Sequence, residues 1–288
     1  MMNKLIFPVL FIACLFVTAC GDDNNENEPI PPFSLEKNYY EVRLERSATS
    51  IHITNGSGDI SLAIEDESIL NATYEGGLYA DDLRGVISLH GKQKGNTILT
   101  IHDNVTGDEE RVEVKVTDCY LAYAIANSNH PVLKVNSVLF LVNNLERDCY
   151  IFAKDNLHGK LYEQPMAKGS YSFFVTIDAG TGPSPQLYGI PNLRLTYPSD
   201  DDGNLANFNI IATPHDFQIE LWGDDATSSN VLSIIQSYLG VDWEKLVGKA
   251  QTRSEPPIDL TMTLTVPNTE YQITGVLSTA SIPEHVLD

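Results

Sequence analysis

The first part of the chain alternates apolar and polar residues with a period of two. Between Phe33 and Thr117, short alternating runs are separated by turns such as 55–58, 76–77, 91–95 and 106–108. A period of two places every second side chain on one face of a strand. Short strands at this spacing predict an antiparallel β-sandwich in which each sheet has one wet face. The apolar positions of these runs include Tyr40, Val42, Leu44, Ile51, Ile53, Ile60, Leu62, Ile64, Ile87, Leu89, Leu99, Ile101, Val112, Val114 and Val116.

Residues 118–288 have a less regular pattern that still predicts strands. Apolar runs at 121–126 and 135–142 are typical of buried strands. Loops rich in glycine and proline separate the further strands that we expect, at 149–153, 170–177, 192–197, 208–212, 217–222, 258–266 and 271–278.

One stretch changes to the period of a helix. Ser228 or Ser229 can cap its start, and Gly240 suits its end. Asp242 is placed to cap a second short helix, with Trp243 on the apolar side and expected in the core. The apolar face of the first helix consists of Val231, Leu232, Ile234, Ile235, Tyr238 and Leu239.

Two glycine turns resemble those of a known module. The stretches Asn55-Gly-Ser-Gly-Asp59 and Gly91-Lys-Gln-Lys-Gly-Asn-Thr-Ile-Leu-Thr-Ile-His-Asp103 are similar to the bacterial immunoglobulin-like modules of surface proteins. The resemblance covers residues 33–117 and implies an Ig-like β-sandwich that acts as a spacer or adhesion unit. We therefore expect a mainly β chain, with this sandwich followed by a β-rich α+β domain at 118–288 that has one or two short helices.

The N-terminal segment has the pattern of a secretory signal. Lys4 precedes an unbroken apolar run from Leu5 to Val17. The run is too short for a membrane span, which needs roughly 20 residues. Val17-Thr18-Ala19-Cys20 resembles the lipobox of bacterial lipoproteins, in which the signal is cut before a cysteine that receives lipid. We expect a signal peptide at 1–19 and lipidation of Cys20; the alternative is an ordinary signal in which Cys20 is incidental.

The next segment, Gly21 to Pro32, is acidic and proline-rich and has too little apolar surface to fold. With Cys20 it is predicted to be a flexible tether. Its acids resemble the export signal of Bacteroidetes surface lipoproteins, which implies an outer-membrane anchor facing the cell exterior. A plain solvated linker is the alternative.

Charge and cysteine content narrow the candidate partners. The formal net charge of −21 argues against nucleic acid and against direct docking on anionic lipid. Cys119 and Cys149 are predicted to form a disulfide in an oxidising compartment, although two separate buried thiols stay an alternative. Their spacing does not suggest a zinc site.

A search for catalytic motifs finds no nucleophile elbow, no His-Glu-x-x-His pair, no phosphate-binding glycine loop and no dinucleotide fingerprint. We therefore expect no enzyme and no cofactor. Asp200, Asp202 and Asn204 offer alternate oxygens for Ca²⁺, but their spacing departs from an EF-hand loop and favours a solvated turn.

Aromatic residues near carboxylates are the better candidates for binding. Trp222 falls on the polar face of its predicted strand and is followed by Asp224 and Asp225, so it could stack on a sugar ring while the carboxylates bind its hydroxyls. The alternative is that the following helix covers Trp222. Tyr188 and Tyr197, beside glycine and proline, would extend this platform.

These observations favour a lipid-anchored, non-catalytic protein of the cell surface that binds a glycan or a protein of a host or neighbouring surface. Two other classes stay open. One is a glycan-handling hydrolase whose second domain is catalytic, and the other is a structural subunit of a surface fibre that assembles by strand addition.

Overall fold

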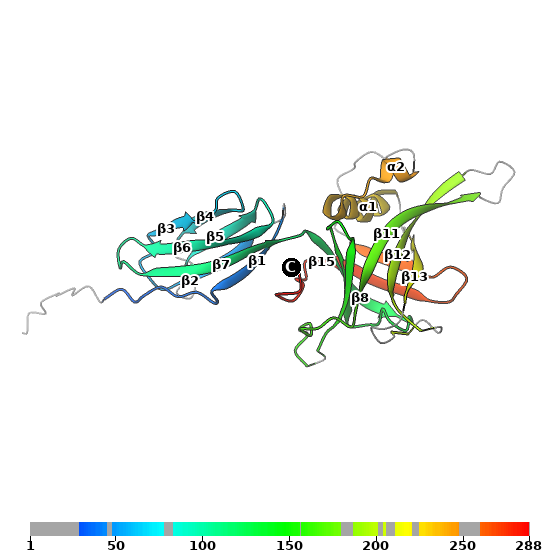
Figure 1. Ribbon diagram of the computed structural model, residues 1–288, viewed down its shortest axis with the longest axis horizontal. Helices are drawn as coiled ribbons and strands as arrows, with labels where there is room; N and C mark the ends of the chain where they lie inside the picture. Colours follow the sequence, from blue (N-terminus) through cyan, green and yellow to red (C-terminus); the bar gives the residue numbers. More distant parts are fainter. Residues whose placement is uncertain are drawn as a thin grey trace, which may run out of the picture.

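The computed structural model describes residues 29–44, 48–77, 83–155, 157–179, 187–200, 204–205, 211–220, 225–247 and 260–287. The predicted signal peptide, Cys20 and most of the tether lie outside these residues. The described chain is mainly β, as the sequence predicts. Its strands form two bodies, which Figure 1 shows at opposite ends of the long axis.

The first body is a sandwich of two sheets. One sheet has the order β1 (Tyr39–Arg43), β7 (Glu109–Thr117), β6 (Gly95–Asp103), β3 (Ile60–Ile64), and the other β2 (Thr49–Thr54), β5 (Leu83–Gly91), β4 (Leu70–Gly76). β1 runs parallel to β7, and the other pairs are antiparallel. The alternating apolar positions form the core between the sheets, where Ile51, Ile87, Leu99 and Val114 are fully buried.

The second body is a closed up-and-down barrel. Each strand pairs antiparallel with the next along the chain, and the last strand returns to the first. A register shift between Thr274 and Gly275 lies in this closing pair. The strands are β8 (Tyr120–Ser128), β9 (Ser137–Val142), β10 (Asp148–Ala153), β11 (Ala167–Ala179), β12 (Leu187–Pro198), β13 (Ala212–Glu220), β14 (Thr261–Thr265) and β15 (Gln272–Ser278).

Helix α1 (Asp225–Leu239) covers one end of the barrel, with α2 (Trp243–Val247) beside it (Figure 1). Val231, Ile235 and Leu239 are buried against the barrel interior, which confirms the predicted apolar face. The helix begins earlier than the capping serines predicted, at Asp225. Gly240 ends it at a φ of 64°, as expected.

The second helix is also positioned as the sequence predicts. The Asp242 carboxylate accepts a hydrogen bond from the Lys245 amide at 3.1 Å, which caps α2. Trp243 is buried, and its Nε1 donates to the Leu232 carbonyl at 2.8 Å. No helix in the described part of the chain is long and apolar enough to span a membrane.

The segment after β15 packs on the outside of the barrel. Ile282 and Leu287 are buried against the outward side chains of β8, β9 and β10, which include Phe140, Tyr150 and Phe152. The same segment reaches the sandwich, where the His285 ring stacks on Tyr39 at 4.6 Å. The C-terminal segment 279–287 therefore contacts both bodies.

The disulfide predicted between Cys119 and Cys149 is wrong, because the structure has two separate buried thiols. Cys149 pairs with Leu141 of β9, and the Cys119 carbonyl accepts a hydrogen bond from Asn143, which directly follows β9. β9 therefore lies between the two cysteines. Neighbouring strands are about 4.8 Å apart, so the Cα atoms exceed the roughly 7 Å limit for a disulfide. Burial raises the pKa of the Cys149 thiol to about 12.

Candidate functional site

The helix-bearing end of the barrel collects most of the predicted ligand residues. β13 ends at Glu220 and α1 begins at Asp225, so Trp222 and Asp224 fall in the connection at this end, outside the described residues. Tyr188 lies near the start of β12, where it pairs with Asp178. Because β12 and β13 are antiparallel, the start of β12 lies at the same end of the barrel as the end of β13. The side chains of Tyr188 and Asp225 are also outside the description.

Tyr197 does not belong to this platform, and its assignment as a ligand residue is wrong. It alternates with Leu193 and Leu195 on the inward face of β12, and its side chain is fully buried. Its ring stacks on the imidazole of His215 at a centroid distance of 4.4 Å. Burial raises the pKa of its hydroxyl. Tyr197 is therefore a core residue of the barrel.

A cavity of about 320 Å³ lies at the helix-bearing end, between the barrel wall and the helices. Its aromatic floor comes from β11. The Tyr171 and Phe173 rings meet edge to face at 5.7 Å, and Phe173 contacts Trp243 in the same way at 5.5 Å. These contacts fix the floor, because each ring is held by the next. The cavity is lined by Arg147, Tyr171, Ser172, Phe173, Val241, Asp242, Lys245 and Leu246.

The charged groups at this cavity are held by local contacts. Arg147 Nη1 donates to the Leu239 carbonyl at 2.6 Å and to Asn143 Oδ1 at 2.7 Å. The guanidinium thus sits at the C-terminus of α1, where the helix dipole favours a cation. Lys245 Nζ lies 2.8 Å from the Asp242 carboxylate at the rim. An aromatic floor with a charged rim suits a ligand that has one apolar face and polar edges.

The opposite end of the barrel holds two histidines that the sequence analysis did not single out. His130 is buried, and its Nδ1 accepts hydrogen bonds from the amides of Val132 and Leu133 at 3.2 and 3.1 Å. Burial lowers the pKa of His130 to about 4, so the ring is neutral at pH 7. It organises the turn after β8 in the way that a side-chain cap does.

The second histidine forms a pair with a serine. Ser199 Oγ lies 2.9 Å from His215 Nε2, and burial lowers the pKa of His215. Ser199 is only 4% exposed, His215 is half-buried, and neither lines any of the cavities described here. The signal for His215 was its even spacing from Phe217 and Ile219, which places all three on the inward face of β13.

The weak calcium candidate forms a closed turn where it is described. The Asp200 carboxylate accepts hydrogen bonds from the backbone amide of Asn204 at 2.7 Å and from its side-chain amide. Asp202 lies outside the described residues. Among the residues that the structure describes, no group of three or more His, Cys, Asp or Glu side chains is arranged to hold a metal ion.

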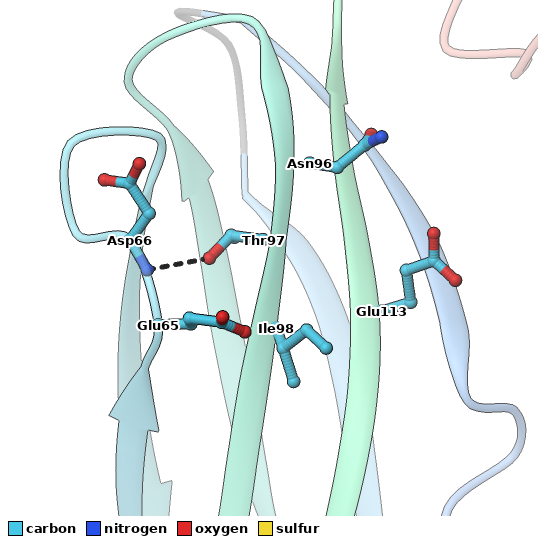
Figure 2. Close-up of a pocket in the computed structure, with 6 residues that line it drawn as sticks. All are labelled: Glu65, Asp66, Asn96, Thr97, Ile98 and Glu113. Carbon is cyan, nitrogen blue, oxygen red and sulfur yellow. Dashed lines mark hydrogen bonds between the residues drawn. The ribbon is translucent and has the colours of Figure 1, made fainter.

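The largest of these cavities, about 530 Å³, is a shallow acidic groove on the outer face of the sandwich. Figure 2 shows Asp66 and Glu113 on opposite sides of this groove with their carboxylates pointing apart. The Asp66 amide donates to Thr97 Oγ1 at 3.0 Å, and its carboxylate accepts hydrogen bonds from Ser68, which lower its pKa. The carboxylates do not converge on a common point, so the groove is a solvated face of the sheet.

Comparisons with known proteins do not assign this chain to a family. No family model and no curated protein matches it. Similar solved structures include domains 5–6 of the S-layer protein SbsC, at 12% identity and a TM-score of 0.26, covering 66% of this chain and 96% of that one. Domains 4–9 of the same protein match at 12% identity and a TM-score of 0.26, covering 73% and 36%. TM-scores this low do not establish a shared fold.

Proposed function

We propose that this protein is a lipid-anchored, non-catalytic binding protein of the cell exterior. The sandwich, which we assign to the bacterial Ig-like modules, acts as a stalk. The barrel domain binds a glycan or a protein of a neighbouring surface at its helix-bearing end. The anchor rests on the lipobox and acidic tether of the sequence, and the ligand site on the aromatic-floored cavity.

The stalk role is supported by the two ends of the sandwich, because the tether joins one end and the barrel joins the other. At one end, the Pro31 carbonyl accepts a hydrogen bond from the Gly56 amide. At the other end, Thr117 pairs with Arg43 and leads into the barrel. The 9 residues of β7 separate these ends by roughly 30 Å. A lipid attached before residue 29 therefore places the barrel away from the membrane (Figure 1).

Cys20→Ser is expected to move the protein from the membrane fraction to the soluble fraction. Acyl chains contribute about 0.8 kcal/mol per buried CH₂, and several chains are needed for stable attachment. Cell fractionation with metabolic lipid labelling measures the change. Loss of the lipid label together with release from the membrane is the expected result, and unchanged labelling and membrane partitioning of the variant would rule out the lipid anchor at Cys20.

The released Cys20→Ser protein also allows the binding site to be tested on a glycan array and on immobilised cells. Leu246→Asp puts a charge beside the aromatic floor and is expected to weaken binding roughly tenfold or more, because a leucine contact is worth about 1.5–3 kcal/mol. Leu157→Asp is the matched control: Leu157 is 87% exposed and lies between β10 and β11, at the other end of the barrel. Equal losses in both variants would contradict a site at the helix-bearing end.

The same preparation separates the alternative functions. Trp222→Ala should weaken binding with little change in thermal stability if the indole contacts ligand, and should destabilise the fold if α1 covers it. Release of reducing sugar from a bound glycan would indicate a hydrolase. Polymers seen by light scattering, without binding to any surface, would indicate a fibre subunit.

A further inference from the structure

A third cavity lies at the seam between the sandwich and the barrel. It measures about 320 Å³ and is more enclosed than the other two. By the volume of liquid water, about 30 Å³ per molecule, it has room for roughly ten waters, which is the scale of one sugar ring. Its walls are Lys37, Tyr40, Glu41, Arg43, Ala48 and Thr49 of the sandwich, Thr117 and Tyr120 at the junction, and Ser281, Ile282 and Glu284 of the C-terminal segment.

The walls of this seam cavity are held in place by contacts between the two bodies. The Glu41 carboxylate accepts a hydrogen bond from the His285 amide at 2.8 Å, and Lys37 forms an ion pair with Glu284. The Tyr120 hydroxyl accepts a hydrogen bond from the Ile282 amide at 3.1 Å. The cavity is therefore built by the fold from three separate segments.

Most charges in the seam cavity are already satisfied. Lys37 pairs with Glu284, and Glu41 accepts hydrogen bonds from the Tyr39 hydroxyl and the His285 amide. Arg43 differs, because within the described residues its guanidinium contacts only the Tyr120 ring, whose centroid lies 4.6 Å from Cζ. A guanidinium that stacks by its face keeps its N–H donors directed outward in its plane. Arg43 is thus the cation available to a ligand.

Hydroxyl-bearing side chains complete the walls of the cavity, namely Thr49, Thr117 and Ser281. Tyr40 contributes no ligand group, because it alternates with Val42 on the buried face of β1, opposite to Arg43, and its hydroxyl is buried in the sandwich.

We propose that the seam cavity binds a small hydroxy-carboxylate of monosaccharide size, such as a uronic acid, through Arg43. A carboxylate matches the planar fork of one arginine and carries one negative charge. A phosphate is disfavoured because its second charge would face Glu41 and Glu284. Hydroxyl groups on the ligand match the hydroxyl-bearing walls. This site is separate from the cavity at the helix-bearing end and does not depend on the function proposed there.

Titration calorimetry of the full-length Cys20→Ser protein with glucuronate, glucose and phosphate tests the proposal. Glucuronate should bind at least tenfold more tightly than glucose or phosphate. Arg43→Gln should weaken glucuronate binding tenfold or more, and Arg43→Lys should not restore it fully, because a lysine lacks the fork. Arg111→Gln, at an exposed arginine of β7, is the matched control and should bind normally.

The melting temperature of unliganded Arg43→Gln distinguishes a ligand contact from a structural role. Arg43 is only partly buried, so its replacement should leave that temperature nearly unchanged while glucuronate binding weakens. Absence of glucuronate binding at millimolar concentration would overturn the proposal. Binding of glucose or phosphate as tight as that of glucuronate, or unchanged binding in Arg43→Gln, would overturn it as well.

Discussion

Asp103→Ala is expected to destabilise the sandwich by roughly 3–5 kcal/mol, because it leaves several buried donors without an acceptor. Asp103 is fully buried at the end of β6. Its carboxylate accepts hydrogen bonds from the Ser57 amide and hydroxyl at 2.7 and 2.6 Å, and from the amides of Val105 and Thr106 at 3.0 and 3.1 Å. One carboxylate therefore organises two neighbouring turns, at the end of the sandwich where the tether joins.

The pH dependence of this effect follows from the pKa of Asp103. Burial alone would raise it, but the hydrogen bonds from Ser57, Thr106 and Val105 outweigh burial and lower it to about 2. Between about pH 4 and pH 2 the unfolded chain takes up a proton that the folded chain does not. The stabilisation is therefore complete above pH 4 and is lost as the pH falls to 2.

The measurement must report on the sandwich itself. The two tryptophans of the chain are Trp222 and Trp243, both in the second domain, so hydrogen exchange of the β6 and β7 amides is a better probe than fluorescence. Glu110→Ala, at an exposed position of β7, is the control and should change stability by less than 0.5 kcal/mol. A similar small change in Asp103→Ala would show that the carboxylate does not organise these turns.

The strands of the sandwich could be predicted because local pattern and burial agree there. Val112, Val114 and Val116 alternate with polar residues, and all three are buried in β7. β4 is not evident from the sequence because its alternation is weak. Leu70 is buried, but the positions that follow it on the same face, Ala72 and Tyr74, are a small and an amphipathic side chain that are only partly buried.

Closure of the barrel could not be predicted from local pattern. It depends on pairing between β15 and β8, which are separated by most of the domain sequence. The contact that holds Arg147 at the candidate site is also long-range, because the guanidinium donates to the carbonyl of Leu239. Inside the barrel, the hydroxyl of Tyr123 likewise donates to the distant carbonyl of Met262. Hydrophobic periodicity shows which face of a strand is buried, but it does not show which strands meet.

Strand direction and side-chain alternation explain which predicted ligand residues fall at the helix-bearing end and which one does not. Trp222 and Asp224 fall at one end of the barrel because the strands of a meander alternate in direction. Tyr197 was misassigned because a proline follows it, although its spacing from Leu193 and Leu195 already marked it as inward. The two-residue spacing along the strand indicates the direction of a side chain more strongly than a neighbouring proline does, because the proline only ends the strand.

Gly169→Ala is expected to destabilise the barrel by roughly 3 kcal/mol, at the upper end of the range for overpacking. Gly169 pairs with Cys149 of β10 and lies directly against the backbone of β12. A Cβ at this position would be 2.0 Å from the Thr196 carbonyl oxygen and 3.1 Å from the Tyr197 Cα. These are backbone atoms, which cannot rotate away as the end of a side chain would. The methyl group must therefore separate β11 from β12, which disturbs the packing of Tyr197 on its inward face.

Gly159→Ala is the matched control for this substitution. Gly159 lies in the loop between β10 and β11, with no other atom within 4 Å of an added Cβ, but its φ is 68°. Alanine there costs only the left-handed backbone conformation, about 1–2 kcal/mol. Thermal unfolding followed by the fluorescence of Trp243, which is buried against the barrel, compares the two variants. If Gly169→Ala loses no more stability than Gly159→Ala, the close approach of β11 and β12 is not a constraint on the barrel. A larger loss, with the sandwich amides still protected from exchange, would show that this contact stabilises the barrel independently of the stalk.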